Sequence, residues 1–324
     1  MKTKSEIALS IVISVFNEEE ILDLFFKTLS NVLIDMDIRY EIIFVNDGST
    51  DKTMNILSSF IPKNRNIKLI SFSRNFGHEA AMIAGIDYAK GNTVICMDGD
   101  LQHPPSCIKG MYDIYCQDRT DVINMVRSNK SKSIMSSFFY WLINKISPFE
   151  IEPNASDFFL ISRRVADILR KDYRQRSRFL RGFIQTIGFP KKSLSFYAPQ
   201  REAGQSKYRF FKLLSLSFVA IASFSKIPLR LGSILGVLSG LFSIFLAIYS
   251  VIMKFIDKPV SGYTTIVVFM SLMMSIQFFI LGAIGEYVGM LFDEQKKWPI
   301  YIVEETKNIA SGDVDSQLNV NLNQ

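Results

Sequence analysis

The sequence predicts an α/β domain with a mostly parallel sheet, followed by a hairpin of two transmembrane helices. In the first half of the chain, short apolar runs alternate with amphipathic helical patterns. Such alternation is typical of a parallel sheet covered by helices. Further on come two uncharged spans, residues 231–253 and 260–285. Each is long enough to cross the roughly 30 Å hydrocarbon core of a membrane.

The alternation is regular from residue 7 to residue 126. Strands are expected at Ile7–Phe16, Tyr40–Asn46, Ile67–Phe72, Thr93–Met97 and Val122–Val126. Helices are expected between them, at residues 18–34, 51–60, 78–89 and 105–116. After Glu305 the sequence is polar, Asn-rich and without periodicity, so a disordered tail is expected there.

Polar residues follow four of these strands where each strand ends. They are Asn17-Glu18, Asp47-Gly48-Ser49, Ser73-Arg74-Asn75 and Asp98-Gly99-Asp100. Ligands bind at the carboxyl ends of the strands in an open α/β sheet, so these groups are expected at one ligand-binding edge. His78, at the start of the next helix, either contacts a phosphate there or has a structural role.

Asp98 and Asp100 are the most informative residues at this edge. Hard cations such as Mg²⁺ or Mn²⁺ bind through one or two carboxylates plus substrate phosphates, so this spacing indicates a site for a metal-bound diphosphate. Asp-Gly-Asp is also ordinary turn chemistry. The polar groups at the neighbouring strand ends favour the ligand site over a simple turn.

Composition agrees with a protein whose cysteines face the cytosol. The chain has 324 residues and a formal net charge of +6, which fits anionic lipid or phosphorylated ligands and does not require nucleic acid. The three cysteines lack metal-binding spacing and are interpreted as reduced thiols. No signal peptide is expected from the first residues.

The two uncharged spans carry Gly and Ser among Leu, Ile and Phe, as packed membrane helices do. The alternative is a pair of buried helices in a soluble protein. Lys and Arg residues flank the spans and place both termini in the cytoplasm. Two shorter apolar segments, residues 134–146 and 208–224, either lie in the membrane interface or pack on the α/β domain.

Four motifs together resemble family 2 glycosyltransferases, which have the GT-A fold. They are Ser14–Glu19, Phe44–Ser49, Ser73–His78 and Met97–Gln102. The chain is similar in particular to polyprenyl-phosphate glycosyltransferases, a group that includes dolichol-phosphate mannose synthases and bactoprenol glucosyltransferases. Residues 156–159, 176–179, 201–208 and 285–289 also match that group, and the resemblance covers about residues 7–303.

The resemblance implies roles for matching residues. Those expected to hold the base and ribose of a nucleotide are Ser14, Phe16, Glu18, Val45 and Asp47. Those expected to hold a Mg²⁺ or Mn²⁺ ion and the diphosphate are Asp98, Gly99 and Asp100, with Asp98 and Asp100 as the metal ligands. Those expected to face phosphates are Arg127, Arg201 and Lys207. Catalytic roles are implied for Asp100, Asp157, Arg201 and Lys207. Ser14, Phe16 and His103 depart from the usual Pro, Tyr and Asp, which leaves base and sugar preference open.

The implied reaction is an inverting transfer of a hexose from UDP- or GDP-hexose, with UDP-glucose favoured, to a polyprenyl (undecaprenyl) phosphate. It would take place at the cytoplasmic membrane face and supply cell-envelope glycan modification. The acceptor phosphate is ionised at neutral pH, so a strong general base is unnecessary. Asp157 acts either as a base or as a group that orients the acceptor or a basic neighbour. Arg178 either contacts the lipid phosphate or lies on a solvated helix face. Expected partners also include a second copy of the chain, a flippase and a downstream glycosyltransferase.

Two other functions are alternatives to this glycosyltransferase reaction. A processive polysaccharide synthase would need more membrane helices to form a channel, and an inactive scaffold or flippase partner would not need the intact carboxylates. The expected domains are a GT-A nucleotide-sugar-binding domain (1–204), an interfacial amphipathic helix and linker (205–228), the transmembrane hairpin (229–290) and a partly disordered cytoplasmic tail (291–324). Removal of residues 229–324 is expected to leave a folded, nucleotide-binding domain.

Overall fold

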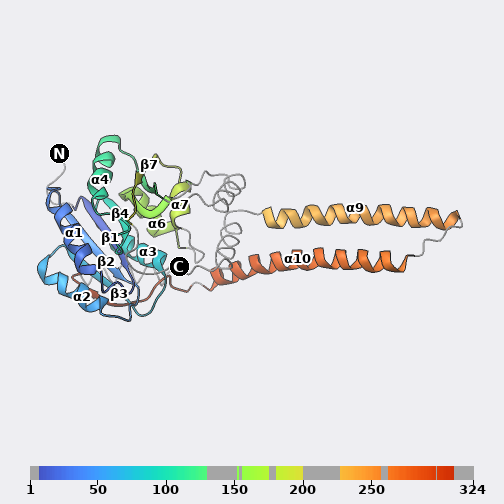
Figure 1. Ribbon diagram of the computed structural model, residues 1–324, viewed down its shortest axis with the longest axis horizontal. Helices are drawn as coiled ribbons and strands as arrows, with labels where there is room; N and C mark the ends of the chain where they lie inside the picture. The colour runs from blue at the N-terminus through green and yellow to red at the C-terminus, as the bar shows by residue number, and fades with distance from the viewer. Residues whose placement is uncertain are drawn as a thin grey trace. The chain divides into compact units, whose positions relative to one another are not determined.

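The computed structural model describes residues 7–129, 152, 155–174, 180–199, 227–256, 262–296 and 298–309. They belong to two compact units, which are described separately (Figure 1). The first unit is an α/β domain built from residues before 200 together with residues 298–309. The second contains the two long helices. The apolar segments 134–146 and 208–224 lie outside the described residues.

An eight-stranded sheet forms the centre of the α/β domain. Its strands are β1 (Leu9–Val15), β2 (Tyr40–Asn46), β3 (Ile67–Phe72), β4 (Thr93–Asp98), β5 (Val122–Arg127), β6 (Ala155–Ser162), β7 (Lys191–Phe196) and β8 (Val303–Lys307). The strand order is β7-β5-β6-β4-β1-β2-β3-β8. Strands β4, β1, β2 and β3 are all parallel, β5 is parallel to β7, and β6 and β8 run antiparallel to their neighbours. The predicted, mostly parallel sheet is confirmed.

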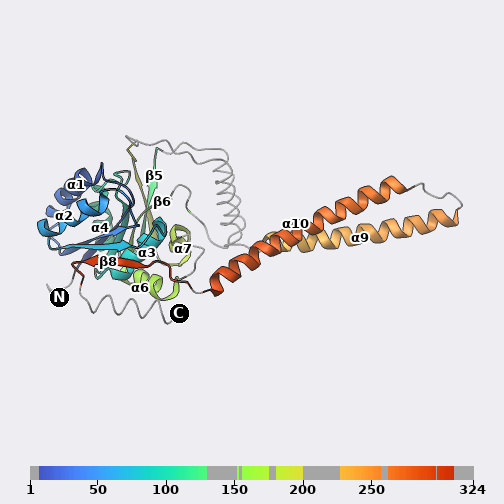
Figure 2. The same cartoon turned by 90° about the horizontal axis from the view of Figure 1, so that it is seen from below.

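Helices cover both faces of this sheet (Figure 2). They are α1 (Leu22–Ile34), α2 (Thr53–Phe60), the short 3₁₀ helix η1 (Ile61–Lys63), α3 (His78–Tyr88), α4 (Cys107–Asp118), α6 (Arg163–Asp172) and α7 (Leu180–Thr186). Helices α1, α2 and α4 contribute to one core, and α3, α6 and α7 to the other. The central strands are buried on both sides, which is why they read as continuous apolar runs in the sequence.

Helix α3 lies directly against the central strands because Gly85 leaves room for it. A Cβ atom at Gly85 would lie 2.0 Å from Cγ1 of Val12 in β1. Residues Ala80–Tyr88 of this helix are all buried, so its position is determined by packing on every side. This close contact fixes the start of α3 beside the carboxyl ends of β1 and β4, where the polar residues gather.

The segment after the second long helix returns to the α/β domain. β8 pairs antiparallel with β3, and the buried Tyr301 stacks on Phe72 with ring centroids 5.1 Å apart. The Tyr301 hydroxyl donates a 2.7 Å hydrogen bond to Asp87, and two nitrogens of Arg174 bind the same carboxylate at 2.8 and 2.9 Å. Burial raises the pKa of Asp87 above its ordinary value despite Arg174. A buried carboxylate needs an opposite charge and hydrogen-bond donors around it, and Arg174 and Tyr301 supply them to Asp87.

One expectation is therefore corrected. Residues after Glu305 do not begin a disordered tail at once, since β8 continues to Lys307; residues 310–324 lie outside the described residues. The strand was missed because its sequence, Val-Glu-Glu-Thr-Lys, is charged, as edge strands often are. Removal of residues 229–324 would also delete this strand and Tyr301, so a folded truncated domain stays a prediction, and it would have to fold with β3 as an unpaired edge.

The second unit consists of α9 (Ile227–Phe255) and α10 (Tyr263–Gln295), which pack antiparallel. A Cβ at Gly232 would lie 3.1 Å from Ile280, and the rings of Phe242 and Phe269 are 6.0 Å apart. Both helices are long and apolar enough to cross a membrane, and α10 continues past the predicted end at Gly285. Their apolar windows are only 0% and 6% buried, which argues against buried helices of a soluble core.

The packing of α3 leads to a stability prediction. Gly85→Ala should destabilise the protein by about 1–3 kcal/mol, because the new methyl overlaps Val12 and forces helix and sheet apart. Gly110→Ala in α4 is the matched control, because nothing lies within 4 Å of its added Cβ. Its higher helix propensity should leave stability unchanged or raised by up to about 1 kcal/mol. Thermal unfolding of the purified chain measures both; equal stability of the two variants would contradict the close contact.

Candidate active site

The carboxyl ends of β1 and β4 lie side by side where the strand order of the parallel core reverses. From β1 the chain continues to β2 and β3 on one side, while β4 lies on the other. Ser14 and Asp98 are register partners across this boundary. Crevices at such a reversal are the usual ligand sites of open α/β sheets. The expected edge is therefore present, and Asp98 stands at its centre.

The side chains of Ser14 and His78 both contact the Asp98 carboxylate. The Ser14 hydroxyl lies 3.3 Å from Oδ1, and Nδ1 of His78 lies 3.1 Å from the same oxygen. Ser14 Oγ and His78 Nδ1 are 2.6 Å apart, so the three form one polar cluster. Nε2 of His78 lies 4.0 Å from Oδ2 of Asp157 on β6. His78 thus connects two of the expected functional carboxylates from the first position of α3.

His103 holds the backbone of Asp98 from the protein interior. Its ring is buried against Phe158, with centroids 5.2 Å apart, and its Nδ1 accepts a 3.0 Å hydrogen bond from the Asp98 backbone N–H. Burial and the nearby Arg127 lower the pKa of His103 to about 3, so the ring is neutral. The residue that departs from the usual Asp therefore positions Asp98. Arg127, expected to face phosphates, lies with Nη2 3.5 Å from His103 Nε2.

Negative charge is crowded at this edge. Burial, together with repulsion from Asp100 and Asp157, raises the pKa of Asp98 from 3.8 to about 6, although His78 and Ser14 oppose the shift. Asp100 Oδ1 accepts a hydrogen bond from the backbone N–H of Gln102 at 3.0 Å. Three neighbouring carboxylates with so little compensating charge fit a bound cation.

A divalent cation fits the donor set only in part. Within the described ranges, no group of three or more His, Cys, Asp or Glu side chains is arranged to hold a metal ion. Asp98 and Asp100 would therefore supply two carboxylates and leave the remaining positions to other oxygen donors. That arrangement suits Mg²⁺ or Mn²⁺, which commonly complete their coordination with substrate phosphates and water.

A cavity of about 470 Å³ opens at the ends of β1, β2, β3 and β8. We call it the strand-end cavity. It is lined by Phe16, Asn46, Gly48, Ser49, Thr50, Met54, Ser71, Phe72, Ser73, Arg74, Asn75 and Glu304. Of the residues expected to hold base and ribose, only Phe16 is in this lining, and its ring is 43% exposed.

The other residues expected to bind the nucleoside have other contacts. The side chain of Val45 is fully buried, and the Glu18 backbone N–H donates to Thr53 Oγ1 at 2.9 Å. The Asp47 carboxylate, 3% exposed, accepts hydrogen bonds from the backbone N–H groups of Phe76 at 2.7 Å and Gly77 at 2.9 Å. Asp47 thus holds the loop before α3, and the cavity gives no support to its expected contact with a nucleotide.

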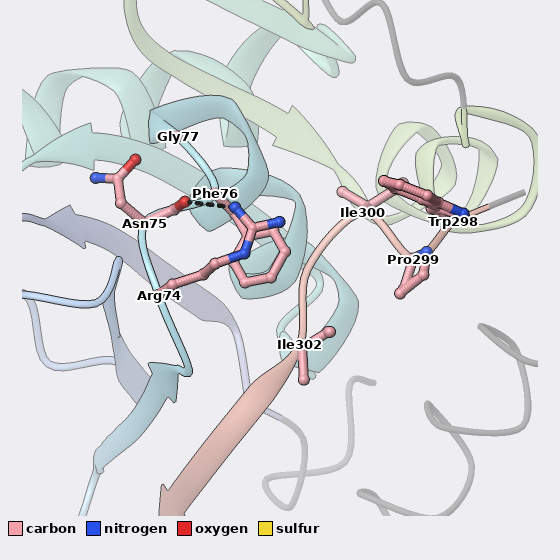
Figure 3. A pocket seen from close by; sticks show the side chains of 8 residues that line it. All are labelled: Arg74, Asn75, Phe76, Gly77, Trp298, Pro299, Ile300 and Ile302. Atoms are coloured by element: carbon pink, nitrogen blue, oxygen red, sulfur yellow. Dashed lines mark hydrogen bonds between the residues drawn. The ribbon is translucent and has the colours of Figure 1, made fainter. Parts of the chain in front are cut away.

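Gly48 brings the same loop close to the end of β2. Its φ is +67°, and an added Cβ would lie 2.4 Å from the carbonyl carbon of Arg74. Beyond the loop, a second cavity of about 390 Å³ separates Arg74–Gly77 from Trp298 and its neighbours (Figure 3). The Arg74 guanidinium lies 4.1 Å from the centre of the Phe76 ring. Arg74 and Asn75 line both cavities.

Sequence reasoning missed some of these residues for identifiable reasons. For His78 the sequence leaves a phosphate contact or a structural role open, and it does not indicate the contacts with Ser14 and Asp98 that the structure shows. Asn46 precedes the expected Asp47 and faces the cavity, where its Nδ2 donates to Ser71 at 3.0 Å. No pattern in the sequence pointed to Glu304 as a site residue, because strand β8 was not expected. Arg178, Arg201 and Lys207 lie outside the described residues.

The chain is similar to proteins of one family. A family model described as Glycosyl transferase family 2 matches residues 10–167. "Uncharacterized glycosyltransferase YkcC" of Bacillus subtilis (strain 168) is 35% identical over 93% of this chain and 95% of its own length. "Uncharacterized glycosyltransferase sll0501" of Synechocystis sp. is 38% identical over 92% and 95%. The "Bactoprenol glucosyl transferase" of Shigella phage SfV is 34% identical over 92% and 99%.

The raised pKa of Asp98 predicts how its removal changes stability with pH. A carboxyl whose folded pKa is about 6 instead of 3.8 lowers stability fully above about pH 6 and not at all below about pH 4. Asp98→Asn should therefore stabilise the cation-free protein by about 1–3 kcal/mol at pH 7.5, and the gain should vanish toward pH 4.

Thermal unfolding in a chelator measures this effect, with the exposed Asp113→Asn in α4 as the control. A gain that stays constant from pH 4.5 to pH 8 would show that the charge of Asp98 is not its cause.

Proposed function

Because the chain belongs to glycosyl transferase family 2, we propose that this glycosyltransferase transfers a hexose from a nucleotide sugar to a polyprenyl phosphate at a membrane surface. The observation that carries the proposal is the crowding of Asp98, Asp100 and Asp157 at the carboxyl edge of the sheet, the edge at which the strand-end cavity also opens. Such an edge suits a nucleotide whose diphosphate brings a cation to the carboxylates and whose nucleoside occupies the cavity.

The lipid nature of the acceptor is supported by a different part of the chain. Helices α9 and α10 expose apolar side chains along their length, as membrane-spanning helices do. A relative similar over nearly its whole length is named bactoprenol glucosyl transferase. An acceptor with a long apolar tail and a phosphate head would be presented at the membrane surface, within reach of a domain attached to such helices.

Pairing of β8 with β3 bears on membrane topology. Residues up to 199 and residues 298–309 belong to the same folded domain, so they must lie on the same side of the membrane. The intervening chain therefore crosses the membrane an even number of times. Two crossings by α9 and α10 satisfy this condition, and the flanking Lys and Arg residues favour the cytoplasmic side.

In the proposed reaction, an acceptor phosphate oxygen attacks the anomeric carbon of the sugar, and the bond from that carbon to the diphosphate oxygen breaks. The acceptor phosphate is already ionised at neutral pH, so no proton must leave it. A divalent cation held by Asp98 and Asp100 would stabilise the charge that develops on the departing diphosphate. Ser14, His78 and His103 keep Asp98 in place, and Asp157, 4.0 Å from His78 and from Arg181, orients the acceptor side.

Finer features complete the proposal. The acceptor phosphate would attack the anomeric carbon from the face opposite the departing diphosphate, which inverts the anomeric configuration. UDP-glucose is the favoured donor, with undecaprenyl phosphate as acceptor. Phosphates of the donor or acceptor would be bound by Arg201, Lys207 and Arg178. Gly99 lets the chain turn between the two metal-binding carboxylates. The product would supply cell-envelope glycan modification, with a second copy, a flippase and a downstream transferase as partners.

Transfer of radiolabelled sugar tests the proposal. Purified chain in nanodiscs should move label from UDP-glucose, or from another member of a UDP- and GDP-hexose panel, into organic-extractable undecaprenyl phosphate. Asp98→Asn and Asp100→Asn should each lower the rate by at least about 100-fold, because both remove charge that holds the cation. Asp113→Asn serves as the control and should keep the full rate.

Each other result has a definite meaning. Undiminished transfer in excess EDTA would refute the cation role of Asp98 and Asp100. A polymeric product would point to a processive polysaccharide synthase. No turnover with any donor, by chain that remains folded, would point to an inactive scaffold.

A further inference from the structure

The lining of the strand-end cavity contains one acidic and one basic residue. These are Glu304 of β8 and Arg74 of the loop after β3; the other lining residues are apolar or carry neutral polar groups. Glu304 comes from a segment that follows both long helices in the sequence. The cavity is therefore completed by a residue more than 200 positions away from Phe16 and Asn46.

A β-bulge directs Glu304 toward the cavity. On β3, Ser71 and Phe72 are consecutive, but their partners on β8 are Glu305 and Val303. Glu304 is the extra residue between those partners. Bulges bend a strand and re-aim one side chain, and they are frequent beside functional sites. The irregularity thus falls on the one acidic residue of β8 that lines the cavity.

The Glu304 carboxylate is also free to bind a ligand. Among the described residues it has no hydrogen-bond or ion-pair partner, whereas its neighbour Glu305 lies 3.3 Å from the ammonium group of Lys307. Asp47, the acidic residue expected to hold the base or ribose, is occupied by the backbone N–H groups of Phe76 and Gly77. Glu304 can supply the acceptor that Asp47 does not.

Strand order indicates which end of a nucleotide Glu304 would meet. Neighbouring strands lie about 4.8 Å apart, so β8 is roughly 19 Å from β4, where Asp98 holds the cation of the diphosphate in the proposed function. The cavity extends from Phe16 at the end of β1 outward to β8. A nucleotide with its diphosphate at β4 would therefore point its base toward β3 and β8.

We propose that Glu304 and Arg74 select the nucleobase of the donor. This inference rests on the proposed function. A carboxylate only accepts hydrogen bonds and a guanidinium only donates them. Together they match a base edge on which a ring N–H adjoins a keto oxygen, as in uracil and guanine. Cytosine and adenine present an unprotonated ring nitrogen beside an amino group. A base held with its ring nitrogen at Glu304 and its exocyclic group at Arg74 would therefore match the pair if it is uracil or guanine and oppose it at both positions if it is cytosine or adenine.

Nucleotide binding to the full chain in nanodiscs, measured calorimetrically with UDP, GDP, CDP and ADP in Mn²⁺, tests this selection. The wild type should bind UDP or GDP at least about tenfold more tightly than CDP and ADP. Glu304→Gln should reduce that preference to about threefold or less, because an amide both donates and accepts. Glu305→Gln is the matched control: it neutralises the adjacent residue of the same strand and should keep the wild-type preference.

The outcomes separate the inference from the proposed function. An unchanged preference in Glu304→Gln, or an equal loss of affinity for all four nucleotides, overturns the inference alone if sugar transfer is intact. A preference that depends on Glu304 in a protein without transfer activity supports base selection and refutes the transferase reaction. No binding of any nucleotide by folded wild type overturns both.

Discussion

Burial of a carboxylate beside two others at one edge of the sheet is the constraint on which the site in the α/β domain depends. Asp98, Asp100 and Asp157 come from two strands and a turn. Burial of Asp98, together with repulsion from Asp100 and Asp157, raises its pKa to about 6. The surrounding protein compensates with oriented groups: the Ser14 hydroxyl, the His78 ring and, for the Asp98 backbone, the neutral His103. Each of these depends on an element packed in the core. His78 stays in place because α3 is buried on all sides, and α3 can pack so closely because of Gly85.

The sequence was sufficient to predict the first half of the domain and the location of the site. β2 and β3 match their expected bounds, and α3 ends one residue early, because strongly periodic, apolar segments leave little choice of structure. Asp98 and Asp100 were identifiable because two carboxylates directly follow a buried strand. The two apolar helices were equally predictable from hydropathy, although α10 runs further than expected.

Other features depend on contacts between distant segments, which local patterns do not encode. The occupation of Asp47 by the loop before α3 requires knowing that Gly48 packs on Arg74. Strands β6 and β7, antiparallel and parallel neighbours of β5, follow a long segment without a clear alternation. β8 is short and charged, and its partner β3 lies more than 230 residues earlier. An edge strand needs little apolar sequence, since only one side of it is paired.

Strand β8 is also the last strand of the described sheet to be synthesised. When residues up to 199 have left the ribosome, β3 still has an unpaired edge and Asp87 lacks the hydroxyl of Tyr301. Both apolar helices must emerge before residues 301–307 can dock. An open edge is a site for wrong pairing with other chains. The nascent protein therefore carries that liability throughout the synthesis of α9 and α10, and the sheet closes only after the hairpin has been made. Completion of the domain thus becomes a late step of biogenesis, coupled in time to the fate of the membrane helices.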